Sequence, residues 1–173
     1  QPFISNCENY ILVFNGEIYN YKEIRSDLIK LGYIFLSGSD TEVVLYSYKE
    51  WGIKCLDRFI GMFAFVIMDK AQGKLILTRD RAGVKPLYYY SNGKDFAFSS
   101  ELKSFTKFDN FKQVINKDIL PYYFQFSYIP APHTIYNNCF KLKPGHFIEY
   151  DLDDHFYSIH KYWDIVDFYL MDK

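Results

Sequence analysis

The sequence predicts a single-domain α+β fold in which helices and strands occupy different stretches of the chain. Apolar residues recur at helical spacing in two segments before residue 56, whereas strand-like segments separated by turn residues follow from residue 62. Strands that mostly follow one another along the chain favour a layered α+β arrangement over a doubly wound sheet. A chain of 173 residues with 49% hydrophobic content is long enough for one sizeable core.

The first predicted elements are a strand and an amphipathic helix. Residues 9–14 are β-branched and aromatic, and the pair Asn15-Gly16 predicts a tight turn after them. Asn20 stands three residues before Glu23, a capping pattern that predicts the start of a helix. Apolar residues then recur at helical spacing: Ile24, Leu28 and Leu31.

A short strand at residues 34–36 and a second helix are predicted next. Ser39 and Glu42 form another capping pair, which places the helix start near residue 40. One apolar face marks this helix: Val44, Tyr48, Trp51 and Cys55.

Strands dominate the remainder of the chain. Four are predicted at residues 62–69, 74–80, 86–91 and 95–99, with hairpin turns at Gln72-Gly73 and Asn92-Gly93. Helical pattern returns weakly at residues 101–105 and 117–126. An extended connector, a strand and a polar loop follow at residues 129–132, 146–150 and 151–154.

Composition narrows the class of partner. The net charge is −1 and charged residues are spread along the chain, which argues against nucleic acid or an anionic membrane as partner and favours a small molecule or a protein. No apolar run is long enough to span a membrane, and the first residues show no signal pattern. Three cysteines without a CxxC pair fit a reducing compartment, so we expect a soluble, cytoplasmic protein.

Two short segments carry groups suited to chemistry. Asn15, Gly16 and Glu17 offer a side-chain amide, a backbone N–H and a carboxylate just after a strand, where loops often present functional groups. An Asn-Gly hairpin turn is the alternative interpretation of this segment. Asp40 adds a second carboxylate, and its alternative role is to favour the dipole of the second helix.

Eight sequence blocks, taken in order, resemble the glutaminase domain of bacterial-type asparagine synthetases and its connector to the synthetase domain. They extend over essentially the whole chain: FNGEIYNY, GSDTEVVLYSY, GMFAFVIMD, TRDRAGVKPLYYY, FSSELKSF, YIPAPHTIY, KLKPGHFIEYD and KYWD. The resemblance implies an N-terminal-nucleophile hydrolase, a class II glutamine amidotransferase, with a four-layer αββα sandwich that lacks its first strands here.

The resemblance also implies roles for the two segments. The Asn15 side chain and the Gly16 N–H match the oxyanion hole, and Glu17 and Asp40 match the carboxylates that hold the α-ammonium of L-glutamine. Fixed donors suit a charge that develops on an amide oxygen, and carboxylates offset the desolvation of an ammonium group. In this family the nucleophile is a cysteine at the mature N-terminus, with its own amine as base.

The chain departs from the family pattern at its start. No cysteine stands at residue 1, so we expect that an upstream piece, with the nucleophile and the arginine that binds the substrate carboxylate, precedes it. Cys7 has no α-amine of its own, and Cys55 and Cys139 read as packing residues. The implied organisation is an amidotransferase domain at residues 1–150 and a connector at 151–173.

A synthetase domain with ATP and magnesium is expected beyond this connector, and no cofactor is expected in the glutaminase domain itself. A homodimer is a further possibility that the resemblance raises. Two other functions stay open: a catalytically dead binding or regulatory paralogue, and an amidotransferase that serves another acceptor, as in sugar or antibiotic biosynthesis.

Three further motifs are better explained without a ligand. Arg79-Asp80-Arg81 suggests a phosphate site, but strands flank it where a P-loop needs glycines and a helix, so a structural role is preferred. The segment 37–40 lacks the doubled glycine of a pyrophosphate loop. Four scattered histidines and the acidic run at 151–154 do not form a metal or EF-hand pattern.

Overall fold

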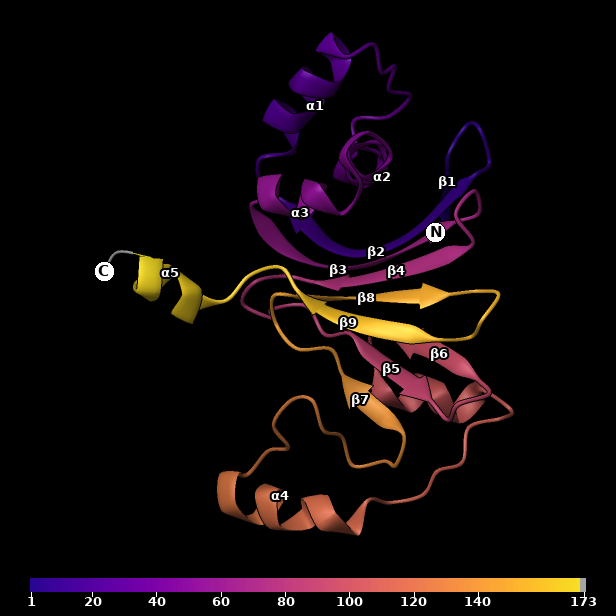
Figure 1. Cartoon of the computed structure of the whole chain (residues 1–173), viewed down its shortest axis with the longest axis vertical. Helices are drawn as coiled ribbons and strands as arrows, with labels where there is room; N and C mark the ends of the chain where they lie inside the picture. Colours follow the sequence, from indigo (N-terminus) through magenta and orange to yellow (C-terminus); the bar gives the residue numbers. More distant parts are fainter. Residues whose placement is uncertain (172–173) are drawn as a thin grey trace.

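The computed structural model describes residues 1–171 as two antiparallel sheets with helices on their outer sides (Figure 1). The larger sheet has the order β1-β2-β3-β4-β8-β9 and the smaller one the order β6-β5-β7. The strands of the larger sheet are β1 (Phe3–Ile4), β2 (Tyr10–Ile18), β3 (Gly61–Asp69), β4 (Lys74–Arg79), β8 (His146–Asp151) and β9 (Tyr157–Lys161). Those of the smaller sheet are β5 (Tyr88–Ser91), β6 (Phe96–Ser99) and β7 (Cys139–Lys141).

Three helices cover one face of the larger sheet over β2 and β3 (Figure 1). They are α1 (Tyr21–Lys30), α2 (Asp40–Trp51) and, after the 3₁₀ turn η1 (Gly52–Lys54), α3 (Cys55–Arg58). Alternate residues of β2 supply its side of this core: Leu12, Phe14 and Ile18. Because side chains alternate across a strand, Val13, Asn15 and Glu17 lie on the opposite face.

The second face of the larger sheet packs against the smaller sheet. Buried residues from both sheets form this core: Ala64, Val66, Leu77, Leu87, Tyr89, Ile148 and Tyr150. On the far side of the smaller sheet, Phe105 of the 3₁₀ helix η2 (Leu102–Lys107) packs with Tyr90. The predicted α+β sandwich of four layers is therefore confirmed, with a 3₁₀ helix in the layer outside the smaller sheet.

Two helices complete the described chain. The short turn η3 (Lys117–Ile119) leads into α4 (Leu120–Phe126), which has Pro121 in its first turn and ends the fold on the side of the smaller sheet (Figure 1). The last helix is α5 (Ile165–Met171). The weak helical patterns predicted near 101–105 and 117–126 thus correspond to η2 and to η3 with α4.

The predicted tight turn at Asn15-Gly16 is wrong, because β2 continues through both residues to Ile18. Asn15 pairs with Ala64 and Gly16 with Phe63 of β3. A Cβ atom at Gly16 would lie 2.6 Å from the Cα of Phe63, closer than real side chains come. The glycine therefore permits two strands to approach each other, which a local turn signal cannot distinguish from a turn.

The predicted strand at residues 34–36 is also wrong, because this segment has no regular structure. The N–H groups of Leu36 and Ser37 donate to the buried carboxylate of Glu42 at 2.9 and 2.8 Å, so they are not available to a strand partner. Ile34 and Leu36, the apolar residues that suggested the strand, are 78% and 77% exposed.

The two predicted helix caps have different outcomes. Asn20 precedes α1 but makes no side-chain capping bond; its amide instead binds Arg58 O and Ile60 N across the loop before β3. The prediction for the second helix is confirmed, since Ser39 Oγ accepts from the N–H of Thr41. That helix ends at Trp51, so Cys55 of the expected apolar face belongs to α3.

The predicted hairpins are confirmed, whereas three short strands escaped prediction. Gln72-Gly73 joins β3 to β4 and Asn92-Gly93 joins β5 to β6. The unpredicted strands are β1, β7 and β9. Strand β9 lies in the segment expected to be a connector, so the sheet extends to Lys161; the domain boundary at residue 150 stays a prediction.

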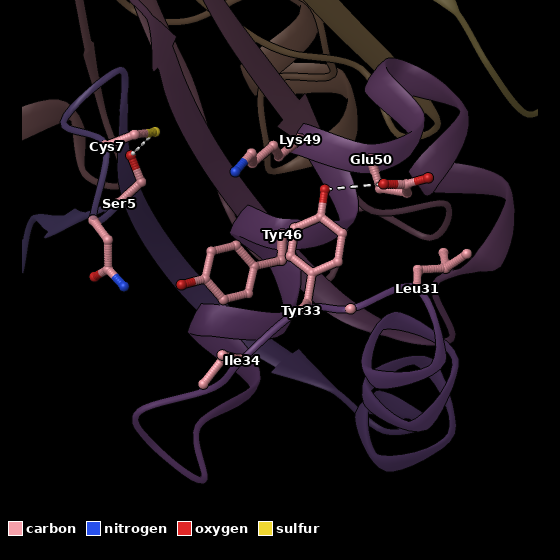
Figure 2. Close-up of a pocket in the computed structure, with 10 residues that line it drawn as sticks. Ser5, Cys7, Leu31, Tyr33, Ile34, Tyr46, Lys49 and Glu50 are labelled. Carbon is pink, nitrogen blue, oxygen red and sulfur yellow. Dashed lines mark hydrogen bonds between the residues drawn. The ribbon is translucent and has the colours of Figure 1, made fainter.

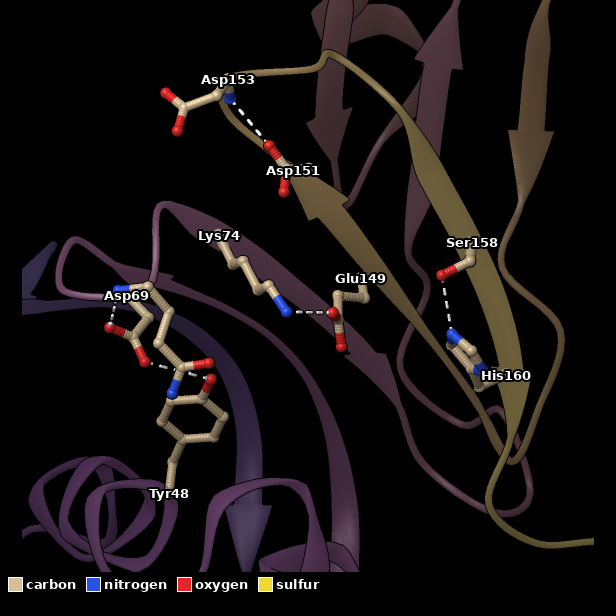
Figure 3. Close-up of polar contacts among 9 residues, drawn as sticks. Tyr48, Asp69, Lys74, Glu149, Asp151, Asp153, Ser158 and His160 are labelled. Carbon is tan, nitrogen blue, oxygen red and sulfur yellow. Dashed lines mark hydrogen bonds and ion pairs between the residues drawn. The ribbon is translucent and has the colours of Figure 1, made fainter.

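Polar contacts hold the later strands of the larger sheet together (Figure 3). Lys74 of β4 forms an ion pair with Glu149 of β8. The carboxylate of Asp151 accepts from the N–H groups of Asp153 and Asp154 at 2.9 and 3.0 Å, which shapes the predicted polar loop between β8 and β9.

Candidate functional site

Asn15 points into the space between the two sheets. Its register partner Ala64 belongs to the core between the sheets, and residues that face each other on paired strands share a face. Nδ2 of Asn15 donates a hydrogen bond to Oγ of Ser100 at 3.3 Å. Asn15 therefore lies on a face where its amide can meet a ligand and a residue of the other sheet.

A pocket of about 410 Å³ opens beside Asn15. Its lining is largely apolar, from β2, β3 and the smaller sheet, with a few polar groups at one side: Val13, Ala64, Phe65, Val66, Leu87, Phe98, Ser99, Ser100, Glu101 and Ser104. A pocket of this size with few convergent polar groups is typical of sites for small molecules.

The N–H of Gly16 lies on the outer edge of β2. The hydrogen bonds of Phe14 and Ile18 show that the backbone groups on this edge point away from β3. Phe14 binds the side-chain amide of Gln1 through both its N–H and its C=O. Ile18 donates its N–H to Asp40. Backbone groups of alternate residues share an edge, and the N–H of Gly16, between these two, has no hydrogen-bond partner within residues 1–171. It is a fixed donor next to the Asn15 amide.

Asp40 begins α2 and joins this helix to the end of β2. Its Oδ2 atom accepts from the N–H of Ile18 at 3.0 Å, while Oδ1 has no protein donor among the described residues. Asp40 also lies in the first turn of α2, where the helix dipole favours a carboxylate. Oδ2 thus binds the end of β2, and Oδ1 is available to a cation.

Glu17 is exposed at the end of β2, one residue before Ile18. Its side chain leaves the sheet on the face of Asn15, whereas Asp40 approaches from the side of α2. No hydrogen bond or ion pair joins the four predicted site residues directly to one another in the part of the chain that the structure describes. What the structure brings together is one short stretch of β2, with Asn15, Gly16 and Glu17 consecutive and Asp40 bound to the next residue.

Cys7 lies in a different pocket, in the loop between β1 and β2 (Figure 2). This pocket of about 480 Å³ is lined from the helix side, by residues that include Tyr33, Tyr46, Lys49 and Glu50. A hydrogen bond with Ser5, whose Oγ lies 3.4 Å from the sulfur, lowers the pKa of the exposed Cys7 thiol. The thiol is accessible, but it does not line the pocket of Asn15.

The other two cysteines are buried. Desolvation raises the pKa of Cys55 strongly and that of Cys139 to about 11. Cys55 packs under α2 and α3, and Cys139 packs in the outer core of the smaller sheet. Their prediction as packing residues agrees with these positions, and none of the three cysteines of the chain lines the pocket of Asn15.

The segment Arg79-Asp80-Arg81 binds backbone groups of its own fold. The guanidinium of Arg79 donates to three carbonyl groups, of Gly83, Lys85 and Leu142. That of Arg81 donates to the carbonyls of Leu56, Asp57 and Phe59. The buried carboxylate of Asp80 accepts from the N–H groups of Phe63, Ala82, Val84 and Lys85. These contacts support the structural interpretation and leave neither guanidinium free for a phosphate.

The described residues include no group of three histidine, cysteine or acidic side chains placed to hold a metal ion. Two of the histidines have separate partners. His155 contacts Tyr150, and Figure 3 shows the contact of His160 with Ser158. No helix within residues 1–171 is long and apolar enough to cross a membrane.

Sequence reasoning missed Ser100, which binds the side chain of Asn15. It lies in the block FSSELKSF, directly after β6, where a polar pair follows an apolar strand. That pattern indicates a strand end, but only the packing of the two sheets places Ser100 beside Asn15, 85 positions earlier.

The family model and the curated relatives that match this chain agree on one family. A family model described as a glutamine amidotransferase domain matches residues 1–163. A Methanocaldococcus jannaschii protein named "Putative asparagine synthetase (glutamine-hydrolyzing) 2" is 44% identical over 160 residues, which are 91% of this chain and 30% of that protein. Asparagine synthetase 3 of Bacillus subtilis, also named glutamine-hydrolysing, is 34% identical over 159 residues, 91% of this chain and 26% of its own length.

Solved structures show the same fold at lower sequence identity. An allosteric regulatory enzyme of purine biosynthesis matches 94% of this chain and 31% of its own, with a TM-score of 0.66 and 22% identity. The glutamine phosphoribosylpyrophosphate amidotransferase of B. subtilis matches 94% and 32%, with a TM-score of 0.64 and 22% identity. The chain thus spans about a third or less of the length of these relatives.

Proposed function

The chain belongs to the glutamine amidotransferase domain family, and we propose that it binds L-glutamine beside β2 and stabilises the charge that forms when the side-chain amide is cleaved. The observation that carries this proposal is the pair of donors at Asn15 and Gly16. One is a side-chain amide at the mouth of a pocket of about 410 Å³, and the other is a backbone N–H without a protein partner within residues 1–171.

Amide cleavage places negative charge on the carbonyl oxygen in the tetrahedral intermediate. Donors that are already fixed stabilise this charge without having to reorganise, and the loss of one such donor costs roughly 10²–10³ in kcat. Gly16 is fixed by its pairing with Phe63 of β3, which leaves no room for a Cβ atom beside the backbone of Met62 and Phe63. Asn15 is fixed by Ser100. Both are therefore suited to an oxyanion hole.

The α-ammonium of glutamine needs a carboxylate nearby. Asp40 has one oxygen bonded to Ile18 N and one without a protein donor among the described residues, and Glu17 is exposed at the same strand end. A charge-assisted bond to either carboxylate would offset the loss of water around the ammonium. We assign Asp40 the larger contribution to binding of the ammonium, because α2 and the hydrogen bond with Ile18 fix its position.

None of the three cysteines of the chain lines the pocket of Asn15, so we assign no step of the reaction to Cys7, Cys55 or Cys139. The residues described here bind, orient and stabilise. The released ammonia is proposed to serve the ATP-dependent conversion of aspartate to asparagine. This proposal is supported by the names of the relatives, which are synthetases more than three times as long as the match. ATP and magnesium belong to that second activity.

An assay with ¹⁵N-labelled amide glutamine tests the proposal on the complete gene product that carries this chain. The expected result is ATP-dependent transfer of label to aspartate, and release of labelled ammonia when aspartate is omitted. Transfer of label to a different acceptor would support glutamine hydrolysis but show that aspartate is not the acceptor. Neither release nor transfer would overturn the proposed function and favour a binding or regulatory role.

A further inference from the structure

We propose that Ser100 is a positioning residue, which holds the side-chain amide of Asn15 with its Nδ2 group toward the pocket. The inference rests on the proposed function, because it assigns a role to the support of one oxyanion donor. It adds Ser100, which directly follows β6 of the smaller sheet, to the polar residues that β2 and α2 contribute to the site.

The hydrogen bond between Asn15 and Ser100 connects the larger sheet with the end of β6 in the smaller sheet. Asn15 lies in β2 of the larger sheet, and Ser100 follows Ser99, the last residue of β6 in the smaller sheet. Nδ2 of Asn15 donates to Oγ of Ser100 at 3.3 Å, and this is the hydrogen bond that the structure shows for the Asn15 side chain within residues 1–171. Both residues line the pocket of about 410 Å³.

The chemistry of an asparagine amide explains why it needs such a partner. The group carries an acceptor oxygen and a nitrogen with two N–H donors, and its terminal torsion is broad and roughly two-fold. Rotation by half a turn replaces the donor with the oxygen, which would repel an oxyanion. When Ser100 accepts one N–H of Asn15, the plane of the amide is held and the second N–H stays available to a ligand.

The strand residues beside and opposite Asn15 in the pocket offer no polar group to hold the amide. Its neighbours on β2 and β3 in the pocket are apolar: Val13, Ala64 and Val66. Ala64, directly opposite Asn15, is too small to restrict rotation and has no polar group. Within residues 1–171, Ser100 is thus the side chain that holds the amide through a hydrogen bond.

Steady-state kinetics of glutamine hydrolysis by the complete gene product provides the first test. Ser100→Ala should lower kcat about threefold to tenfold, the effect expected from the loss of one hydrogen bond, and should leave KM within twofold. Ser100→Thr keeps the hydroxyl and should restore most of kcat. Ser26→Ala, which removes an exposed hydroxyl from α1 outside the pocket of Asn15, is the matched control and should leave both constants unchanged.

A double variant separates a role through Asn15 from a general effect on the fold. Asn15→Ala should lower kcat roughly 100-fold or more, and adding Ser100→Ala should then have less than a twofold further effect. A full additional loss in the double variant, or an unchanged kcat in Ser100→Ala, would overturn the role of Ser100 and leave the proposed function intact. An unchanged kcat in Asn15→Ala would instead overturn the proposed function.

A spectroscopic measurement tests the contact independently of activity. The side-chain amide of Asn15 should give two ¹H–¹⁵N signals, with one proton slow to exchange because Ser100 accepts it. In Ser100→Ala that protection should disappear, while Ser100→Thr and Ser26→Ala keep it. Equal exchange of both protons in the unsubstituted protein would contradict the inference.

Discussion

Oδ2 of Asp40 accepts a hydrogen bond from the N–H of Ile18 at 3.0 Å, which ties the first residue of α2 to the last residue of β2. The contact gives Asp40 a structural role that is distinct from the proposed contact with the substrate ammonium. Since an asparagine oxygen can accept the same bond, replacement of the carboxylate by an amide separates the two roles.

Asp40→Asn should lower kcat/KM for glutamine by an amount equivalent to about 2–5 kcal/mol, because a buried ammonium would lose its charged partner. Stability should change by only about 0.3–1 kcal/mol, the scale of a carboxylate at a helix N-terminus. Kinetics and denaturant unfolding measured on the same preparation check both values. Glu23→Gln, which removes an exposed carboxylate from the first turn of α1, is the control. Altered stability with unchanged kinetics would exclude Asp40 from the site.

Gly16→Ala should destabilise the fold by about 1–3 kcal/mol, because its new Cβ would collide with the backbone of Met62 and Phe63. Gly38→Ala provides a matched comparison, since a Cβ there has no neighbour within 4 Å and its backbone needs no glycine. Urea unfolding of the two variants measures the difference. Equal stabilities would show that β2 and β3 are not held as closely as described.

Glu42→Gln should destabilise the protein at neutral pH and much less in acid. Burial raises the pKa of the Glu42 carboxyl, but hydrogen bonds from Leu36 and Ser37 outweigh this, so its pKa lies below the ordinary 4.5. A carboxyl with a lowered folded-state pKa stabilises the fold above its unfolded-state pKa, and this contribution disappears as pH falls through the folded-state pKa.

The free energy of unfolding of Glu42→Gln should therefore be about 1–3 kcal/mol below that of the unsubstituted protein at pH 7, the cost of leaving buried donors poorly paired. Denaturant unfolding at a series of pH values from 7 down to about 3 should show this difference shrinking. Glu23→Gln should show no such trend. A difference that stays constant with pH would mean that the carboxyl is not held ionised in the fold.

Alkylation should distinguish the three cysteines. At pH 8 the exposed Cys7, whose pKa is lowered by its bond with Ser5, should react with iodoacetamide well before buried Cys55 and Cys139. Mass spectrometry of the folded protein locates the modified residue. Cys7→Ser should leave glutamine hydrolysis unchanged, since Cys7 lies outside the pocket of Asn15. A large loss of activity would instead place this thiol in the reaction.

Much of the fold could be predicted because local patterns and packing agree in long elements. Residues 62–68 of β3 are continuously apolar, and the strand lies between helices on one face and the smaller sheet on the other. The pair Ser39 and Glu42 marked the start of α2 correctly, because Ser39 bonds a neighbouring N–H and the signal is local.

Two of the errors occur where distant residues decide the structure. Asn15-Gly16 carries the signal of a turn, but contact with Phe63 requires the glycine within a strand. Asn20 has the signal of a helix cap, but its amide binds Arg58 and Ile60, about 40 residues away. The role of Ser100 depends on the packing of two sheets, so no local pattern could have placed it.

The most direct test measures the effect of Asn15→Ala on the two reactions proposed for the complete gene product, asparagine synthesis from glutamine and from free ammonia. We predict that the glutamine-dependent kcat decreases by roughly two to three orders of magnitude, as expected for the loss of an oxyanion donor, while synthesis from ammonia is spared. An equal decrease in both reactions would make Asn15 a residue of the fold. No decrease in either reaction would contradict the assignment of the site to β2.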